Sequence, residues 1–337
     1  MPPTFVTNGN GAGPSDVGIW YCTYYETDWD HVLIDHEHRG GTSGYPPCLF
    51  RPLCSNEPGD YRTYRANDTA VIDFHLEQIA AAKIDFLLFE LTPGGLGGYR
   101  PSFNYLVDNA RAVCQRIKVW NDNNSWRIKY AVAAGAHPDV YGSGSVGLCM
   151  EKEAEDVYDS FYNNPSYGGP DNYYQLNGKP LIVYWGPISW GDDLVFSWDS
   201  YGEDQTYGNC FTMRYAAHVF SGTYGWNILP GGTQRHNEVE VVSPGWGFSG
   251  TNPVLRNCGD FYSECWNFVL RNPKPRIVMI AGFNDYLERT AVFTTDTSNL
   301  IIDGEKWYGH NGQLHPSMYW DMTIDNINTL RGGCGNG

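Results

Sequence analysis

Two carboxylic acids lie three residues apart late in the chain, directly after a run of apolar residues. The apolar run covers residues 276–281, and the two acids are Asp285 and Glu288. A buried strand that ends in such a polar segment brings its side chains to one place, where an acid and a base can act on one bond of a bound substrate. Taken alone, the two acids fit better as a cap of the next element or as part of a surface loop. The pattern along the rest of the chain therefore has to decide between a catalytic and a structural role.

The overall composition fits one large α/β barrel and disfavours several kinds of partner. The chain has 337 residues, 42% of them apolar, and its 38 acidic and 22 basic side chains give a net charge of -16. Such a chain repels phosphate backbones and anionic lipids, so we expect neither nucleic acid nor a membrane as a partner. No apolar run reaches membrane-spanning length. We expect a monomer, because one barrel can act alone.

Apolar, β-rich runs alternate with segments of helical periodicity along the chain. The spacing of apolar residues predicts helices at residues 68–83, 102–118, 151–163, 260–270 and 318–330. The apolar runs predict strands at residues 17–25, 85–91, 127–134, 179–185, 211–217, 225–229, 238–242 and 276–281. Eight strands with helical or long connections predict an α/β fold, a single-domain (β/α)8 TIM barrel with long loops. An open doubly wound sheet is the alternative, and the lack of a Gly-rich phosphate turn after the first strand disfavours it.

No Pro-, Ser- or Gly-rich linker divides the chain into independent domains. One catalytic barrel is therefore predicted at residues 17–331. An N-terminal segment at 1–16 precedes it, and a C-terminal tail at 332–337 follows it.

The active site of such a barrel lies at the C-terminal ends of its strands. The second predicted strand ends with Glu90, whose carboxyl group must be partly buried and is either paired with a cation or functional. His137 and Asp139 follow the third strand, Trp185 ends the fourth, and Trp246 follows the seventh. Acids, histidines and tryptophans at one rim fit a cleft that cleaves sugars better than a redox or phosphate site.

Aromatic residues make up 15% of the chain, including 24 Tyr and 12 Trp. Their flat apolar faces and polar edges suit stacking on sugar rings, although large aromatic residues are also common in protein cores. We predict that the residues near the strand ends position the sugars, which adds Asn284, Tyr286, Trp20 and Tyr21 to the residues above.

The nine cysteines show neither a CxxC pair nor a grouping with zinc spacing, so we expect no metal site and no cofactor. Cys48 and Cys54 bracket a Pro-rich loop, and Cys258 and Cys265 bracket the start of a predicted helix. We predict a disulfide within each of these two pairs. Disulfides are typical of proteins that fold in oxidising compartments.

Two N-glycosylation sequons begin at Asn67 and Asn123. Together with the predicted disulfides they favour a secreted, extracellular protein. No signal peptide is visible in the sequence. We take the signal peptide to have been removed.

Four segments occur along the chain in an order that matches a known family of enzymes. They are Ile19-Trp20-Tyr21 with Glu26-Thr27-Asp28-Trp29-Asp30-His31, Ile72-Asp73-Phe74-His75-Leu76-Glu77-Gln78-Ile79, Leu176-Asn177-Gly178-Lys179-Pro180-Leu181-Ile182-Val183-Tyr184, and Phe283-Asn284-Asp285-Tyr286-Leu287-Glu288. In this order they resemble the glycoside hydrolase family 99-like group, which holds endo-α-mannosidases and endo-α-mannanases. The last segment is similar to the family's Phe-Asn-Glu-Trp-x-Glu motif.

The resemblance implies that Asp285 and Glu288 are the two catalytic carboxylates. In that family the first acid acts as a base on the sugar 2-hydroxyl, which displaces the leaving group and forms a 1,2-anhydro sugar. The second acid protonates the departing oxygen and later activates water, with net retention. Asp285 replaces the family's Glu and is one methylene shorter, which would set its carboxyl group back by about 1.5 Å. Glu90 is the alternative for this role.

We therefore predict a secreted glycoside hydrolase that cleaves within a polysaccharide or glycan, with retention. Glu288 is the general acid, which requires a raised pKa, and Asp285 is the base or nucleophile. A catalytically inactive, carbohydrate-binding barrel is one alternative. A glycosidase of another specificity, such as an α-glucanase-like enzyme with different acids, is a second. A metal-dependent hydrolase is a more distant third.

Overall fold

Seven parallel strands form the centre of the described part of the protein. The computed structural model describes residues 13–26, 50–98, 101–137, 145–186, 194–202, 204–216, 226, 238–247, 254–271, 273–300 and 305–332. The parallel strands are β1 (Asp16–Tyr21), β3 (Phe86–Leu91), β4 (Lys129–Gly135), β6 (Lys179–Trp185), β7 (Thr212–Tyr215), β8 (Val239–Val242) and β9 (Ile277–Ile280). Three short strands pair antiparallel, β5 (Gln175–Leu176) with β6, and β2 (Arg51–Pro52) with β10 (Thr295–Asp296).

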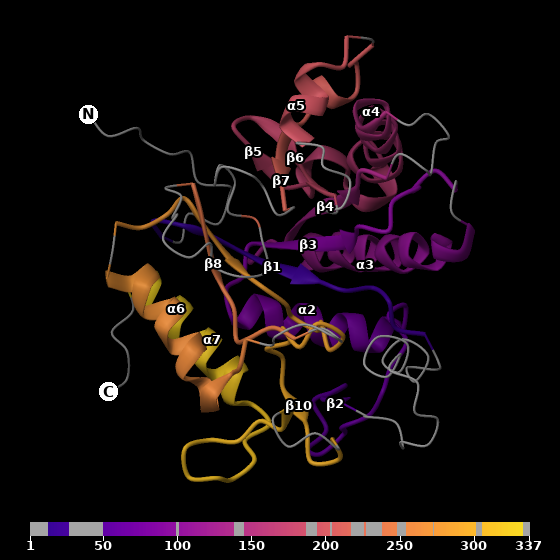
Figure 1. Ribbon diagram of the computed structural model, residues 1–337. Helices are drawn as coiled ribbons and strands as arrows, with labels where there is room; N and C mark the ends of the chain where they lie inside the picture. The colour runs from indigo at the N-terminus through magenta and orange to yellow at the C-terminus, as the bar shows by residue number, and fades with distance from the viewer. Residues whose placement is uncertain are drawn as a thin grey trace, which may run out of the picture.

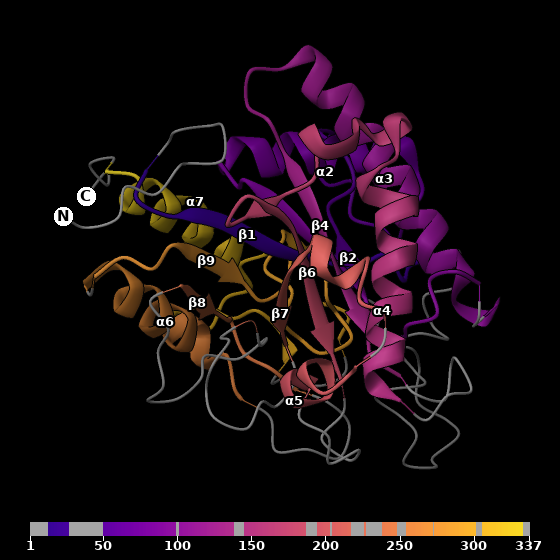
Figure 2. The ribbon, with the colours of Figure 1, turned by 90° about the horizontal axis from the view of Figure 1, so that it is seen from above.

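The parallel strands are hydrogen-bonded in the order β7-β6-β4-β3-β1-β9-β8, and the sheet curls (Figure 2). This is the sequential order of a (β/α)8 barrel, with one position left between β7 and β8. The predicted strand at residues 225–229 would stand at that position. Of these residues only Trp226 is described, and it is buried outside any strand. The predicted α/β class is confirmed, whereas closure into an eight-stranded barrel stays a prediction.

Helices cover the outer face of the curled sheet (Figures 1 and 2). They are α2 (Thr69–Ala81), α3 (Asn104–Asn123), α4 (Val146–Val157), α5 (Leu194–Asp199), α6 (Asp260–Arg271) and α7 (Met318–Leu330). The helix predicted at 151–163 begins earlier, because the Ser145 hydroxyl accepts a hydrogen bond from the Leu148 amide (3.3 Å) and caps α4. Its last part is a π-helical turn, Tyr158–Tyr162. None of the helices in the described ranges is long and apolar enough to cross a membrane.

Side-chain alternation along β1 separates the helix-facing layer from the sheet interior. Tyr21 faces α2, where its hydroxyl lies 2.9 Å from Nδ1 of His75. The next residue, Cys22, faces the other way and contacts Glu90 of β3. Gly18 also faces inward, and a Cβ there would lie 2.3 Å from the Phe86 ring, so only glycine leaves room for this apolar filling.

Both predicted disulfides are wrong. Cys258 carries a free, exposed thiol in the turn before α6, whereas Cys265 is buried in the core, and the two form no disulfide. Cys54 also has a free thiol, which donates to the carbonyl of Arg62 (3.1 Å). Cys48 lies outside the described residues. Sequence spacing alone did not reveal on which side of the backbone each thiol lies.

A buried ion pair ties the end of the chain to the start of the sheet. Arg331, directly after α7, donates from Nη2 to Oδ2 of Asp85 (2.7 Å), and the side chains are only 6% and 9% exposed. The same carboxylate oxygen accepts from the Val17 amide of β1 (2.8 Å). Burial raises the pKa of Asp85, and the charge of Arg331 opposes that shift.

Replacing Arg331 by Met should lower the free energy of unfolding by about 3 kcal/mol, because the buried Asp85 carboxylate loses its counter-ion. Urea denaturation followed by circular dichroism measures the change. Arg271→Met, at an exposed position on α6, is the control and should change the stability by less than about 0.5 kcal/mol. Equal effects of the two substitutions would show that the Asp85 pair does not stabilise the fold.

Candidate active site

The carboxylate of Asp285 organises the turn that follows β9. Its Oδ1 accepts a hydrogen bond from the Glu288 amide (3.0 Å), and its Oδ2 accepts one from the Thr290 hydroxyl (2.8 Å). Its backbone carbonyl accepts from the amides of Thr290 and Ala291, each at 3.0 Å. The residue is only 3% exposed. Asp285 therefore fixes its own loop, the structural role that its sequence context also allowed.

The neighbouring Asn284 fastens this turn to the end of β1. Its Oδ1 accepts from the Cys22 amide (2.8 Å), and its Nδ2 donates to the Cys22 carbonyl (3.0 Å) and to the Tyr64 hydroxyl (2.8 Å). The Tyr25 hydroxyl donates to the Asn284 carbonyl (2.7 Å) and accepts from the Tyr286 amide (3.1 Å). Every polar group of the Asn284 side chain is thus used within the protein.

The sequence predicts sugar contacts for Asn284, Tyr286, Trp20 and Tyr21, but the structure buries all four. Tyr286 stacks on Phe50 with ring centroids 5.1 Å apart, and its hydroxyl lies 3.0 Å from the Thr295 hydroxyl. Tyr21 packs against α2, and Trp20 is 4% exposed within the sheet. All four side chains are thus packed within the protein, and their predicted contact with a sugar stays a prediction that this burial does not support.

Glu90 ends the inward-facing row of β3 and remains partly accessible to solvent. Its Oε2 accepts from the Cys22 thiol (3.3 Å), and its Oε1 accepts from the Thr92 hydroxyl (3.1 Å). The Tyr24 hydroxyl is a further hydrogen-bond partner. In the described residues the partners of this carboxyl group are neutral donors, without the paired cation that the sequence left open.

Glu288 is also partly accessible, and its position is set from two sides. Its Oε2 accepts a hydrogen bond from the indole Nε1 of Trp246 (3.0 Å). Its backbone carbonyl accepts one from the Gly247 amide (3.0 Å). Trp246, predicted to bind sugar, is therefore a partly exposed neighbour of the predicted acid, and its indole orients the carboxyl group.

The three carboxyl groups of Glu288, Glu90 and Asp285 interact electrostatically. Burial, and then the charges of Asp285 and Glu90, raise the pKa of Glu288 to about 8. Burial, and then the charge of Asp285, raise the pKa of Glu90 to about 7. Burial also raises the pKa of Asp285, but hydrogen bonds from the Glu288 amide and the Thr290 hydroxyl oppose this by stabilising the anion. Glu288 therefore keeps its proton at neutral pH, and we infer from the hydrogen bonds that both Asp285 carboxylate oxygens accept that Asp285 is its ionised neighbour.

The rim continues from Glu90 to the ends of β4 and β6. The imidazole Nε2 of His137 lies 2.8 Å from the Thr92 carbonyl, and because a carbonyl oxygen only accepts, Nε2 carries the hydrogen. The His137 ring lies 5.8 Å from that of Trp185, and both are partly exposed. These two predicted residues therefore lie next to each other and near the Glu90 loop. Asp139 lies outside the described residues.

Arg256 is a contributor that the sequence does not reveal. Its guanidinium lies over the rings of Trp307 (5.0 Å) and Tyr319 (4.5 Å). Its Nη2 donates to the carbonyls of Arg289 and Ala291, both at 2.8 Å, just after Glu288. The nearby Val254 pairs with the backbone of Trp246. One cation thus braces both the loop that carries the acid and the segment that carries its tryptophan.

The sequence analysis also did not identify Cys22 and Thr92 as partners of Glu90, although the strand pattern contained a signal for Cys22. Alternation along the first strand puts Gly18, Trp20 and Cys22 on one face, so the inward direction of Cys22 could have been derived. The contact of Thr92 with Glu90 depends on a turn after β3, and the placement of Arg256 depends on a distant aromatic pair. Neither follows from spacing along the chain.

Solved structures show which fold the chain shares. The GH99 endo-α-mannosidase from Bacteroides thetaiotaomicron matches with a TM-score of 0.58 at 14% sequence identity, covering 94% of this chain and 97% of that one. A structure of that enzyme in complex with bis-tris-propane matches with a TM-score of 0.55 at 14% identity and the same coverage. A glycoside hydrolase-like protein matches with a TM-score of 0.54 at 12% identity, covering 97% of both chains.

No protein-family model matches the chain, and no curated protein sequence matches it. The resemblance to glycoside hydrolase family 99 that the sequence motifs indicate is found in the comparison of folds, through the two structures of the GH99 enzyme.

For the glycosidase activity proposed below, the bracing role of Arg256 predicts that Arg256→Met will lower kcat by about 10-fold, with little change in KM, because the loop that carries Glu288 loses its alignment. Arg256→Lys keeps the charge and should recover part of the rate. Steady-state kinetics measures both, and circular dichroism checks that the variants fold. A rise in KM at unchanged kcat would contradict the role in positioning the acid.

Proposed function

We propose that the protein is a glycoside hydrolase that cleaves within a polysaccharide or glycan. The observation that carries the proposal is a partly exposed carboxyl group, Glu288, whose pKa is raised to about 8 beside the buried Asp285 carboxylate. A carboxylic acid that keeps its proton at neutral pH can donate it to a glycosidic oxygen. The fold, shared with solved glycoside hydrolases, supports the same assignment.

Glu288 is the general acid in this proposal, and Glu90 is the base. Asp285 is poorly placed to be the base, because it is 3% exposed and its carboxylate is engaged by its own loop. Glu90 is partly accessible, and its pKa of about 7 suits proton abstraction at neutral pH. This is the alternative that the Glu-to-Asp difference in the motif had left open. Asp285 then acts through its charge and its hold on the loop.

The chemical steps follow the route that the resemblance implies, with net retention. Glu90 takes the proton of the sugar 2-hydroxyl, whose oxygen attacks the anomeric carbon while Glu288 protonates the departing oxygen. The resulting 1,2-anhydro sugar is then opened by water. Glu288, now ionised, takes a proton from that water, and Glu90 returns its proton to the 2-oxygen. Both carboxyl groups end in their starting states.

His137 and Trp185 are proposed to line the sugar-binding part of the cleft, and Asp139 is proposed to join them. The eighth barrel position is proposed to be filled by residues 225–229, which lie between β7 and β8 in the chain. We also propose that the protein is secreted and acts as a monomer, without nucleic acid or membrane partners. Its net charge of -16 supports the last point.

A second candidate is a carbohydrate-binding barrel without activity. Asp285 favours it, because the acid that the family motif would use as base is buried in this chain and bonded to its own loop. Binding of glycans without release of any product, across a panel that includes α-mannans and α-glucans, would select this candidate.

Glu288→Gln and Glu90→Gln should each lower kcat by about 10²- to 10⁴-fold, the usual range for removal of an acid or a base. An aryl glycoside with a nitrophenolate leaving group needs little protonation. Glu288→Gln should therefore regain much of its rate on that substrate, whereas Glu90→Gln should not. Product release is measured by chromatography. Glu264→Gln, at an exposed position on α6, is the matched control and should keep full activity. Full activity of either site variant would refute its role.

The plot of kcat/KM against pH should be bell-shaped. Its acidic limb falls below about pH 7, where Glu90 gains a proton, and its basic limb falls above about pH 8, where Glu288 loses its proton. Removing the Asp285 charge favours ionisation of both neighbours and lowers both pKa values. Asp285→Asn should therefore move both limbs of the kcat/KM profile to lower pH. Asp159→Asn, an exposed acid after α4, should leave the profile in place. Limbs that stay fixed in Asp285→Asn would argue against the coupling.

A further inference from the structure

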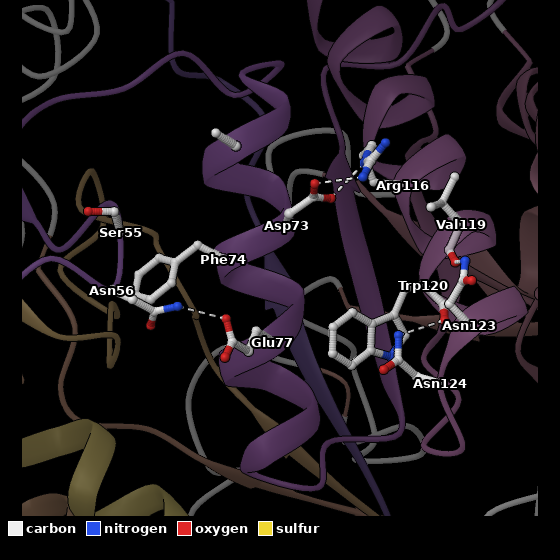
Figure 3. A pocket seen from close by; sticks show the side chains of 11 residues that line it. Ser55, Asn56, Asp73, Phe74, Glu77, Arg116, Val119, Trp120, Asn123 and Asn124 are labelled. Atoms are coloured by element: carbon white, nitrogen blue, oxygen red, sulfur yellow. Dashed lines mark hydrogen bonds and ion pairs between the residues drawn. The ribbon is translucent and has the colours of Figure 1, made fainter.

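A second concave surface lies on the outer helical layer, across α2 and α3 (Figure 3). This groove has a volume of about 460 Å³ and is lined by side chains of both helices and of the loop at Ser55 and Asn56. Its α2 residues are on the side of the helix opposite His75 and Ile79, which pack into the core. The groove is thus separate from the carboxyl groups at the strand ends.

Two polar pairs hold their groups in fixed directions in the groove (Figure 3). Arg116 of α3 donates from Nε and Nη2 to the two carboxylate oxygens of Asp73 on α2, both at 2.6 Å. Asn56 donates from Nδ2 to Oε2 of Glu77 (3.0 Å), and both side chains are exposed. Within the described residues these hydrogen bonds leave Nη1 of Arg116 as a donor and Oε1 of Glu77 as an acceptor for a ligand, and the hydroxyl groups of a sugar ring can both donate and accept.

An aromatic ring and an apolar side chain complete the groove. Trp120 is partly exposed, and its Nε1 donates to the Trp126 carbonyl (2.9 Å), which leaves the ring as a fixed apolar surface. Val119 beside it is 42% exposed. A flat ring next to oriented polar groups is the usual composition of a site for a molecule with one apolar face and polar edges, as a sugar has.

The charge of the lining selects among polar ligands. The two carboxylates of Asp73 and Glu77 and the guanidinium of Arg116 give a net charge of -1, from two negative charges and one positive charge. Anions such as phosphates are therefore disfavoured, and a neutral ligand with many hydroxyl groups fits best.

We propose that this groove is a second saccharide-binding site, which holds a neutral stretch of the polysaccharide away from the catalytic carboxyl groups. The proposal rests on the proposed function for the nature of the ligand. The groove raises the affinity for a long polymer and leaves the cleavage of short oligosaccharides unchanged, because a short substrate does not reach beyond the catalytic cleft.

The test is affinity electrophoresis in native gels that contain α-mannan, β-1,3-glucan or starch. The groove substitutions Trp120→Ala and Glu77→Ala are made in a Glu288→Gln background, which prevents cleavage during the run. Trp120→Ala should raise the apparent Kd for the retained polymer about 10-fold, because the stacking surface is lost. Glu77→Ala should raise it about 3-fold. Glu264→Ala removes the same charge from α6 and should have no effect.

Unchanged retardation in both groove variants, or no retardation of the starting protein by any polymer, would overturn the proposal. If Trp120→Ala does not fold, Asn56→Ala takes its place, because Asn56 is exposed and on a loop. Retention that depends on the groove, in a protein that cleaves no glycan, would support this inference and reject the proposed function. Cleavage that depends on Glu288, with retention independent of the groove, would do the reverse.

Discussion

The buried carboxylate of Asp285 is the interaction on which the site depends. An ionised group so far from water is stable only if hydrogen bonds replace its hydration, and here the Glu288 amide and the Thr290 hydroxyl provide them. These bonds fold the turn after β9 and so place Glu288. Burial, and then this negative charge, raise the pKa of Glu288 and of Glu90. The buried Asp285 carboxylate therefore fixes the position of the proposed acid and, together with the burial of Glu288 itself, keeps that acid protonated.

Contacts from other parts of the structure hold Asp285 and its neighbours in place. Asn284 fastens the turn to the end of β1, and Arg256 braces the far side of the loop from between two aromatic rings. Because Cys22 follows β1 on the inward side, it reaches Glu90 on the adjacent strand β3. Residues far apart in the sequence thus meet at the carboxyl ends of parallel strands, where polar groups are exposed while their backbones are held rigidly.

The sequence reveals the elements better than the directions of their side chains. Apolar runs and helical periodicity locate the seven described parallel strands, since burial on both faces demands such runs. The strand-end rule points correctly to the rim at Glu90, Trp185 and Trp246, but it cannot separate accessible side chains from buried ones. For that reason the rule selected Asn284 and Tyr286, which are buried. Cys54 and Cys258 also do not form the predicted disulfides. The role of Arg256 could not be predicted from the sequence, because its position depends on tertiary packing alone.

Glu288 holds a proton at neutral pH because its carboxyl group is buried and lies beside the negative charge of Asp285. Infrared difference titration of the carboxyl C=O stretch tests this directly, with the protein compared with Glu288→Gln and Asp285→Asn. We expect a protonated carboxyl signal with a midpoint near pH 8 that is lost in Glu288→Gln and shifts to lower pH in Asp285→Asn, whereas the signal of Glu90, with a midpoint near pH 7, remains in Glu288→Gln. A component with a midpoint near pH 8 that persists in Glu288→Gln, or the lack of such a component in the unaltered protein, would contradict this assignment.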